Sequence, residues 1–246
     1  MNEHQKISAD IVATLTAGPH WQDLEVGSLD ALLAKSAVIE AQRGQVLQTR
    51  IGLMLSGVVG FETGVADGRR ALTELFHEGD LIDLRRHDRP SQGRLVCLSD
   101  ARLINIEPAA FDACIRRHAD FGDAFVKQIE DQTGRLRDHT ADLVLKTPVE
   151  RMVSALFEFD RWPEVHEGLP EGDRLSLHLP LLRKDLADYV GVKPETISRT
   201  LRRLLQQGLI ETDPADTALV RLLDRSRLRM IANGGAPRGA RAHRST

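Results

Sequence analysis

The chain has 246 residues, of which 41% are hydrophobic and 28% charged, and its formal net charge at pH 7 is −3. This composition is typical of a folded protein with one or two domains and sizeable cores. No uncharged apolar run reaches the roughly 18 residues of a membrane span, and the first 20 residues contain no export signal, so we expect a cytoplasmic protein without membrane contact. Cys97 and Cys114 are the only cysteines, which excludes a four-cysteine metal site.

The charges are distributed unevenly along the chain. Residues 181–246 hold 13 Lys and Arg against 7 Asp and Glu, whereas the first 180 residues hold 20 against 29. The C-terminal quarter therefore carries a net charge of +6 and the remainder a net charge of −9. A basic module at the end of an acidic chain is typical of a protein that contacts phosphate backbone with one end.

The N-terminal half changes from a helical to a strand-like pattern. Residues 1–27 are expected to be a loosely held lead-in, and Ser28 is a good cap for a short helix. From 38 to 106, short apolar runs alternate with glycine-containing turns, which indicates an antiparallel barrel or roll. Pro108 opens a helix through about Arg117, so residues 28–117 are predicted to form one domain.

A long helix is predicted over residues 118–147. Apolar or small side chains recur on it at three- and four-residue steps, with Gln132 or Thr133 bridging one gap. This spacing is typical of a two-stranded coiled coil. The residues predicted for the dimer interface are Phe125, Ile129, Leu136, Thr140 and Leu143. The alternative is a helix packed into the core of its own chain.

Two short helices joined by a tight turn are predicted between Leu181 and Ile210. The first runs from about Arg183 to Val190, and Gly191 supplies the bend because it lacks Cβ. Pro194 suits the first turn of the second helix. One side of that helix is apolar (Ile197, Leu201, Leu204 and Leu205), and the other is polar (Glu195, Ser198, Arg199 and Arg202). This is the pattern of a helix-turn-helix with a recognition helix.

Residues 148–233 are expected to form the C-terminal domain around these helices. After Ile210, a turn at 211–216 joins two small strands in the manner of a wing, and Asp224 caps a last helix. Residues 234–246 lack apolar periodicity and are predicted to be a disordered tail.

The segment Glu195-Thr196-Ile197-Ser198-Arg199, preceded by the residues DLADYVG at 185–191, resembles the DNA-binding domain of the Crp/Fnr family of bacterial transcription regulators. The resemblance covers roughly residues 28–223. In the N-terminal half it rests on RGQV at 43–46, LSGVV at 55–59 and HEGDLI at 77–82, which resemble the cyclic-nucleotide-binding-like β-roll of that family. Two positions depart from it: Val192-Lys193-Pro194 stands where many members have a Ser or Thr cap, and Leu182 replaces a hydroxyl residue at the start of the first helix. Each change loses a capping acceptor worth about 1 kcal/mol.

The resemblance implies an α+β fold with an N-terminal β-roll sensor, a dimerisation helix and a C-terminal winged helix-turn-helix. It also implies a homodimer on double-stranded DNA with a pseudo-palindromic site and TTGAT-like half-sites. Glu195, Ser198 and Arg199 are then the base-contacting set, because arginine suits guanine O6 and N7 while a carboxylate accepts from cytosine N4. The residues expected to contact phosphate are Arg183, Lys193, Thr196, Arg202 and Arg203. Activation would need contacts with RNA polymerase, for which the loop at 158–173 is a candidate.

The effector is not specified by the sequence. Family members that bind cyclic AMP have Gly-Glu where this chain has Asp83-Leu84, and an arginine segment where it has Ser91-Gln92-Gly93, so cyclic AMP is not expected. Arg85, Arg86 and Arg94 leave open an unconventional anion site. Two cysteines argue against the iron–sulfur cluster of the Fnr branch. Haem stays an alternative, although no spacing singles out a ligand pair among His77, His87, His118 and His139.

Two functions of other classes compete with DNA-binding regulation. The first is a haem or small-molecule receptor that acts through a protein partner, which the arginine-rich face of the 195–203 helix disfavours. The second is an enzyme on a β-barrel, for which the sequence contains no phosphate loop, metal-ligand pair or nucleophile motif. We therefore expect no enzymatic activity.

Overall fold

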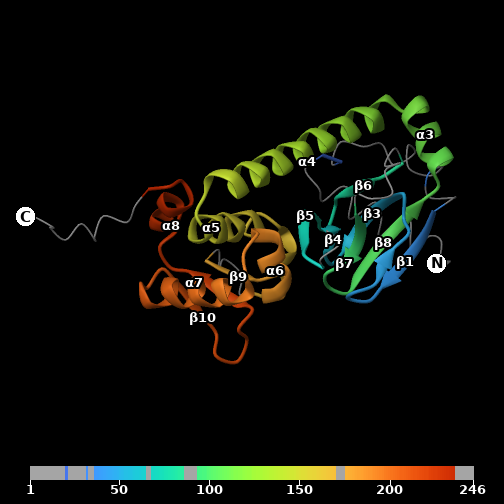
Figure 1. Ribbon diagram of the computed structural model, residues 1–246. Coiled ribbons are helices and arrows are strands. Elements are labelled where there is room, and N and C mark those ends of the chain that lie inside the picture. The colour runs from blue at the N-terminus through green and yellow to red at the C-terminus, as the bar shows by residue number, and fades with distance from the viewer. Residues whose placement is uncertain are drawn as a thin grey trace, which may run out of the picture. The chain divides into compact units, whose positions relative to one another are not determined.

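A computed structural model describes residues 20–21, 32, 36–64, 68–85, 93–169 and 175–235 (Figure 1). The predicted lead-in at 1–27, the helix expected from Ser28 and the tail at 234–246 lie mostly outside these residues. The chain divides into two compact units, residues 1–138 and residues 139–246. In the described part of the chain, no helix is both long enough and apolar enough to cross a bilayer.

Two four-stranded antiparallel sheets form most of the first unit. One has the strand order β1 (Ser36–Ala41), β8 (Ala101–Ile106), β3 (Ile51–Ser56) and β6 (Leu81–Asp83). The other has the order β2 (Val46–Leu47), β7 (Arg94–Cys97), β4 (Val59–Gly64) and β5 (Arg70–Phe76). Apart from the β4–β5 hairpin, neighbouring strands in these sheets are not consecutive in the sequence, as in a β-roll.

The alternation of side chains along the strands produces two hydrophobic cores. On β3, Met54 points between the two sheets, while Leu53 and Leu55 point to the opposite face. The core between the sheets also contains Phe61 and Phe76 of the second sheet. The core on the other face packs against α3 (Pro108–Arg117) and the start of α4 (Ala119–Leu145). There the ring of Phe111 meets the ring of Phe121 edge-on at a centroid distance of 5.5 Å.

The second unit contains the end of α4, four further α-helices and a small sheet. Its elements are α5 (Pro148–Phe159), the 3₁₀ turn η1 (Pro163–His166), β9 (Ser176–His178), α6 (Arg183–Val190), α7 (Pro194–Gln206), β10 (Ile210–Thr212), β11 (Leu219–Leu222) and α8 (Arg225–Ala232). The strand order β10-β11-β9 places a β10–β11 hairpin after α7, which makes the wing of a winged helix. The predicted α+β architecture, a β-roll followed by a long helix and a winged helix-turn-helix, is confirmed.

The helix ends follow the capping signals in the sequence. Thr147 and Glu150 form a reciprocal capping box around Pro148 at the start of α5, and Asp224 accepts a hydrogen bond from the Arg227 backbone N–H at the start of α8. The helix-turn-helix lacks such caps, because Leu182 and Lys193 provide no side-chain acceptor to α6 and α7. Those two helices depend on packing rather than on capping for their position.

The turn between α6 and α7 is fixed by a glycine in a crowded position. Gly191 has φ of 69°, as predicted for the bend, and ends α6. A Cβ at this position would lie 2.9 Å from a methyl carbon of Leu143 and 3.1 Å from a guanidinium nitrogen of Arg151. The turn therefore fits closely against the last turns of α4 and the start of α5, within the second unit.

We expect Gly191→Ala to destabilise the second unit more than Gly208→Ala. Both glycines have positive φ, so each alanine costs about 1 kcal/mol of backbone strain. Only Gly191 has neighbours within 4 Å of the added carbon, because the space beside Gly208 is open. Urea unfolding of the two variants measures the difference, and equal free energies of unfolding would contradict the close fit against Leu143.

Candidate functional site

The recognition helix α7 buries one side and exposes the other. Ile197, Leu201 and Leu204 are buried as predicted, but Leu205 is 37% exposed and Thr200 takes a buried position instead. Thr200 follows Ile197 by three residues, so its side chain lies on the same face of the helix. The amphipathic helix therefore has a narrower apolar stripe than the leucine spacing indicated.

The polar face of α7 presents the three residues predicted to read bases. Glu195 and Arg199 are exposed, and Ser198 is half-buried. The Arg199 guanidinium lies 3.4 Å from the Thr196 hydroxyl, and within the described residues neither Arg199 nor Glu195 belongs to an ion pair. The intrahelical Glu195–Arg199 pair that a solvated helix would form is therefore not made, and both groups are open to an outside partner.

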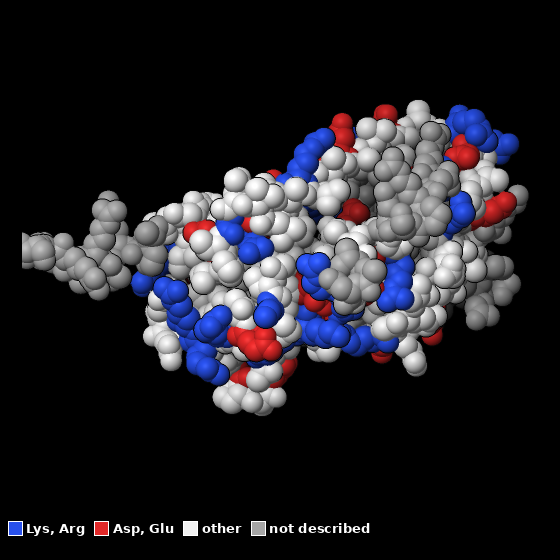
Figure 2. Space-filling view, in the orientation of Figure 1, with Lys and Arg blue, Asp and Glu red and all other residues white. Residues whose placement is uncertain are grey.

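The predicted phosphate contacts surround this face. Arg183 lies in the first turn of α6, Lys193 precedes α7, and all of the predicted basic residues are exposed. Figure 2 shows Lys and Arg side chains gathered over the region where α7 lies in Figure 1, with acidic side chains beside them. Lys184, also exposed at the start of α6, extends this basic surface. It was not among the predicted phosphate contacts, because those were chosen from the residues of the family motif and the second helix.

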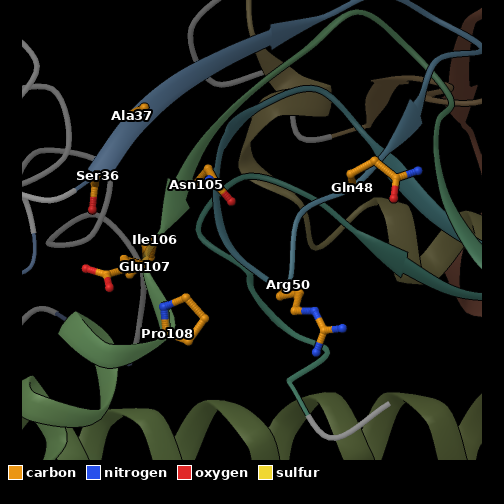
Figure 3. Close-up of a pocket in the computed structure, with 8 residues that line it drawn as sticks. All are labelled: Ser36, Ala37, Gln48, Arg50, Asn105, Ile106, Glu107 and Pro108. Atoms are coloured by element: carbon orange, nitrogen blue, oxygen red, sulfur yellow. The ribbon is translucent and has the colours of Figure 1, made fainter. Parts of the chain in front are cut away.

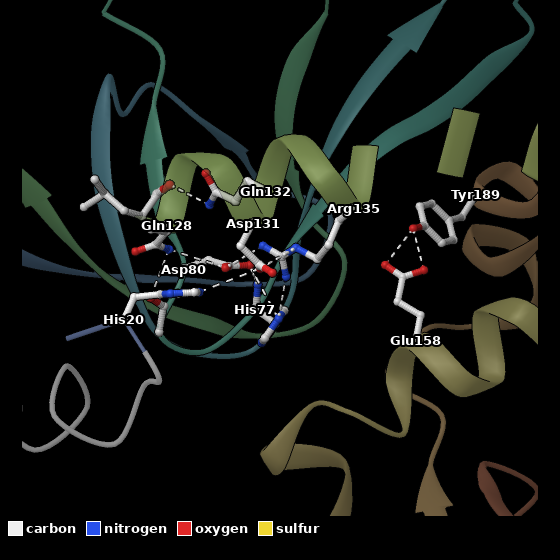
Figure 4. A network of polar contacts seen from close by, with 11 residues as sticks. His20, His77, Asp80, Gln128, Asp131, Gln132, Arg135, Glu158 and Tyr189 are labelled. Atoms are coloured by element: carbon white, nitrogen blue, oxygen red, sulfur yellow. Dashed lines mark hydrogen bonds and ion pairs between the residues drawn. The ribbon is translucent and has the colours of Figure 1, made fainter. Parts of the chain in front are cut away.

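A polar clamp holds α6 in place behind the recognition helix. The Tyr189 hydroxyl donates to the Glu158 carboxylate, with both oxygens 2.8 Å away. On its face, the Tyr189 ring stacks on the His139 imidazole with centroids 4.1 Å apart and planes 2° from parallel. Figure 4 shows the hydroxyl pointing at the carboxylate. The clamp joins the end of α4, α5 and α6 of the second unit, and its residues carry no motif that the sequence could have revealed.

We expect Tyr189→Phe to lower the free energy of unfolding of the second unit by about 1–2 kcal/mol, because Glu158 then loses a hydrogen-bond donor. The ring stack on His139 is kept in this variant. Tyr189→Ala removes both interactions and is expected to cost about 3–5 kcal/mol. Chemical denaturation followed by Trp162 fluorescence measures both losses, and a Tyr189→Phe variant as stable as the parent would show that the hydroxyl contributes nothing.

One face of the predicted dimer helix, α4, packs against the β-roll. Phe121, Ala124, Gln128 and Gln132 are buried against the β-roll, and the Gln132 amide donates to the Leu81 carbonyl at 2.9 Å. Phe125 also packs inward, edge-on to Phe111 at 5.2 Å. The expectation that Phe125 and Gln132 belong to the inter-subunit seam therefore differs from their observed positions, since the chain's own core provides a nearer apolar and hydrogen-bonding environment.

The exposed apolar side of α4 begins one residue later than predicted. Val126 is 54% exposed and Leu136 is 39% exposed. Val126, Ile129, Thr133, Leu136, Thr140 and Leu143 follow alternating steps of three and four, the a and d positions of heptads. We call these six residues the α4 seam. Val126 was missed because Phe125, four residues before Ile129, fits the same spacing and is more apolar.

The arginines that could have held a cyclic phosphate are engaged by carboxylates. The Arg85 guanidinium is bound through two nitrogens by Asp83, at 2.9 and 2.6 Å, and also by Asp112. The guanidinium carbon of Arg85 lies 4.6 Å from the centroid of the Phe111 ring. The hydrogen bonds to Asp83 raise the pKa of Arg85 above its ordinary value. Arg94 donates twice to Glu62, at 2.9 and 2.7 Å. Arg86 lies outside the described residues.

The Glu62 carboxylate is the centre of a second ionic cluster. It is bound by Arg94 and, at 2.7 Å, by Arg70. Burial alone would raise the pKa of Glu62, but hydrogen bonds from Arg94 and Arg70 outweigh burial and hold the pKa below its usual value. Both arginines are bound to this one carboxylate and link strands β4, β5 and β7.

A hollow of about 460 Å³ opens at one end of the β-roll (Figure 3). Its lining contains one guanidinium, from Arg50, and one carboxylate, from Glu107, together with the amides of Gln48 and Asn105. The remaining lining residues are Ser36, Ala37, Ile106 and Pro108. The lining carries no net charge, so it does not select for an anion.

Both cysteines are buried in separate cores. Cys97 lies between the sheets and Cys114 lies in the core beneath α3. Burial raises the pKa of both thiols, that of Cys114 to about 11, with Asp120 adding to the effect. Since the thiolate is the reactive form, both side chains have the environment of inert core thiols.

Comparison with known proteins identifies the same domain. Residues 150–231 match the Crp-like helix-turn-helix domain family. The nitrogen fixation regulation protein FixK of Azorhizobium caulinodans is 28% identical over 180 residues, 73% of this chain and 70% of the relative. The transcriptional activator FnrL of Cereibacter sphaeroides is 22% identical over 164 residues, 65% of this chain and 64% of the relative.

Solved structures share the fold over about four-fifths of the chain. FixK2 from Bradyrhizobium japonicum superposes with a TM-score of 0.67 at 22% identity, covering 80% of this chain and 96% of that one. A CRP/FNR-family transcriptional regulator from Thermus thermophilus gives a TM-score of 0.59 at 19% identity, covering 82% and 100%. The named relatives are transcription regulators rather than enzymes. Residues 150–231 thus match the Crp-like helix-turn-helix domain family, and over most of its length the chain is similar to regulators of the Crp/Fnr type, with which it shares the fold.

Proposed function

We propose that this regulator binds, as a homodimer, a pseudo-palindromic operator with TTGAT-like half-sites. The observation that carries the proposal is the exposed Glu195 and Arg199 on α7, four residues apart and without an ion-pair partner among the described residues. Residues four apart lie on one side of a helix, so a carboxylate and a guanidinium can reach neighbouring base pairs together. Arg183, Lys193, Thr196, Arg202 and Arg203 position the domain on phosphate.

Selection from a pool of random duplexes by the full-length protein tests the proposal directly. A two-fold dimer with one recognition helix per subunit requires half-sites about one helical turn apart, roughly 10 base pairs from centre to centre. We expect an inverted repeat of that spacing to be enriched. A pool without an enriched repeat would overturn the proposed mode of recognition.

We expect Arg199→Ala to lose about 1–3 kcal/mol of affinity for the selected duplex and to relax discrimination at a guanine position. Arg203→Ala is the matched comparison, because a phosphate contact contributes equally on any sequence. It should weaken selected and random duplexes alike and lower the slope of log affinity against log salt by about one. Equal losses on both duplexes for Arg199→Ala would contradict its role in base reading.

The α4 seam is the surface that we propose for the homodimer. Its members are apolar or small, they follow heptad spacing, and Val126 and Leu136 are exposed in the single chain. A coiled coil buries such side chains as knobs in the holes of the partner helix. The polar Thr133 and Thr140 within the seam fit an interface better than a core.

We expect Leu136→Glu to shift the protein from dimer to monomer, because the dimer would then bury two like charges at one seam position. Ala141→Glu is the control, since Ala141 is exposed on the same helix but outside the heptad positions. Sedimentation velocity distinguishes the two species. A Leu136→Glu variant that sediments like the parent would place the dimer interface elsewhere.

We further propose that the sensor unit responds neither to cyclic AMP nor to an iron–sulfur cluster. Arg85 and Arg94 are already bound to carboxylates of the same unit, and an anionic phosphate buried without a cation is costly. The two cysteines are too few for a cluster and are buried in different cores. Haem receives little support, since His139 stacks on Tyr189 and His77 contacts Arg135; His87 lies outside the described residues.

The remaining parts of the proposal concern the setting of the regulator. Action on DNA places it in the cytoplasm, without a membrane partner and without an enzymatic reaction. RNA polymerase is the expected protein partner of an activator, and the segment 158–173 is the candidate contact. A protein-partner receptor is less well supported, because the exposed face of α7 is basic.

A further inference from the structure

The positive charge of the C-terminal quarter is not carried by the helix-turn-helix. Residues 181–224, which contain α6, α7 and the wing, hold seven Lys and Arg against seven Asp and Glu. Residues 225–246 hold six arginines and no Lys, Asp or Glu. The whole net charge of +6 therefore comes from α8 and the residues that follow it in the sequence.

The wing itself is acidic. Glu211, Asp213 and Asp216 are exposed on the β10–β11 hairpin, and the basic residue of this hairpin is Arg221. A hairpin with this balance of charge is repelled by phosphate groups rather than attracted to them. Cations that would hold the second unit on DNA, beyond those of α6 and α7, are therefore to be sought in α8 and after it.

The start of α8 lies beside the end of α7. The backbone N–H groups of Leu223 and Asp224 donate to the Leu209 carbonyl, just after α7, at 2.9 and 3.4 Å. Arg202 and Arg203 are exposed on the second half of α7. Figure 1 shows α7 and α8 at the same end of the second unit, and Figure 2 shows Lys and Arg side chains along that end. Cations of α8 are therefore close to those of the recognition helix.

The three arginines of α8 differ in what they contact. Arg225 donates to both carboxylate oxygens of Asp160, which fastens α8 to α5. Arg229 is exposed, and its guanidinium carbon lies 5.6 Å from the centroid of the Phe157 ring. Among the described residues, no carboxylate forms an ion pair with Arg227 or Arg229. Arg225 therefore serves the fold, whereas the charge of Arg229 is open to an outside anion.

We propose that α8 and residues 236–246 form an arginine arm that binds the phosphate backbone of DNA beside the recognition helix. The arm rests on the proposed function, because it acts on a duplex that α7 has docked. Residues 236–246 contain Arg238, Arg241 and Arg244 and no acidic residue. The guanidinium fork binds phosphate through two hydrogen bonds. A segment of this length spans up to about 36 Å, so arginines that follow α8 can reach phosphates beyond the groove that α7 occupies.

The salt dependence of DNA affinity tests the arm in the full-length protein. A variant that combines Arg238→Gln, Arg241→Gln and Arg244→Gln should lower the slope of log affinity against log salt by about two to three, because each phosphate contact contributes about 0.9. The loss should be the same on the selected duplex and on a random duplex, since phosphate contacts read no sequence. Arg229→Gln alone should lower the slope by about one. Fluorescence anisotropy between about 50 and 200 mM salt measures these slopes.

Two matched variants separate the arm from a general effect of charge. Replacing the same three arginines by lysine keeps the charges, so the parent slope should be retained. Replacing Arg102, Arg116 and Arg117 by glutamine removes three exposed charges from the first unit and should leave the slope nearly unchanged.

The outcomes for the arm and for the proposed function are distinguishable. A glutamine variant of residues 238, 241 and 244 with the parent slope would overturn the arm, and so would an equal loss in the first-unit control. A parent that binds selected and random duplexes equally would count against the proposed operator recognition, while a slope lost only in the 238, 241 and 244 variant would still support the arm. A parent that binds no duplex would overturn both.

Discussion

The helix α4 contacts different parts of the protein with different faces. The β-roll core, the β5–β6 turn and α6 each pack against a different set of its residues, and the rest of the structure depends on this division. Phe121 and Ala124 pack into the core beneath the β-roll, and Gln128, Gln132 and Arg135 bind the turn beside it. On another side of the helix, the α4 seam is exposed at Val126, Leu136, Thr140 and Leu143 and half-buried at Ile129 and Thr133. Beyond residue 138, the helix belongs to the second unit, where its last turns pack against α6.

This division explains why the polar residues of α4 are as informative as its apolar ones. A glutamine on an apolar stripe is compatible with a coiled-coil interface, but it also suits a backbone carbonyl of the same chain. Gln132 donates to Leu81, so it stabilises the fold of one subunit. The carbonyl groups of the β5–β6 turn and of β6 require donors where they are buried, because an unpaired carbonyl in that position is costly.

Several arginines of the first unit and those of α7 differ in their partners. In the first unit, Arg85, Arg94 and Arg135 each contact a carboxylate, and their guanidinium groups serve the fold. On α7, Arg199, Arg202 and Arg203 are exposed. The C-terminal quarter therefore has more cations than anions, and the arginines of α7 are also exposed, so that a phosphate backbone could reach them.

The sequence by itself determined the fold class, the helix-turn-helix and the register of its recognition helix. Gly191, Pro194 and the spacing of Ile197, Leu201 and Leu204 are local signals, because backbone freedom and helical periodicity depend on neighbours in the chain. Only the tertiary structure decided that Phe125 packs inward while Val126 is exposed, that Tyr189 contacts Glu158 and His139, and that Gln132 donates to the Leu81 carbonyl. These outcomes depend on which surfaces meet, and residues 31, 50 and 51 positions apart in the chain carry no periodic signal of their contact.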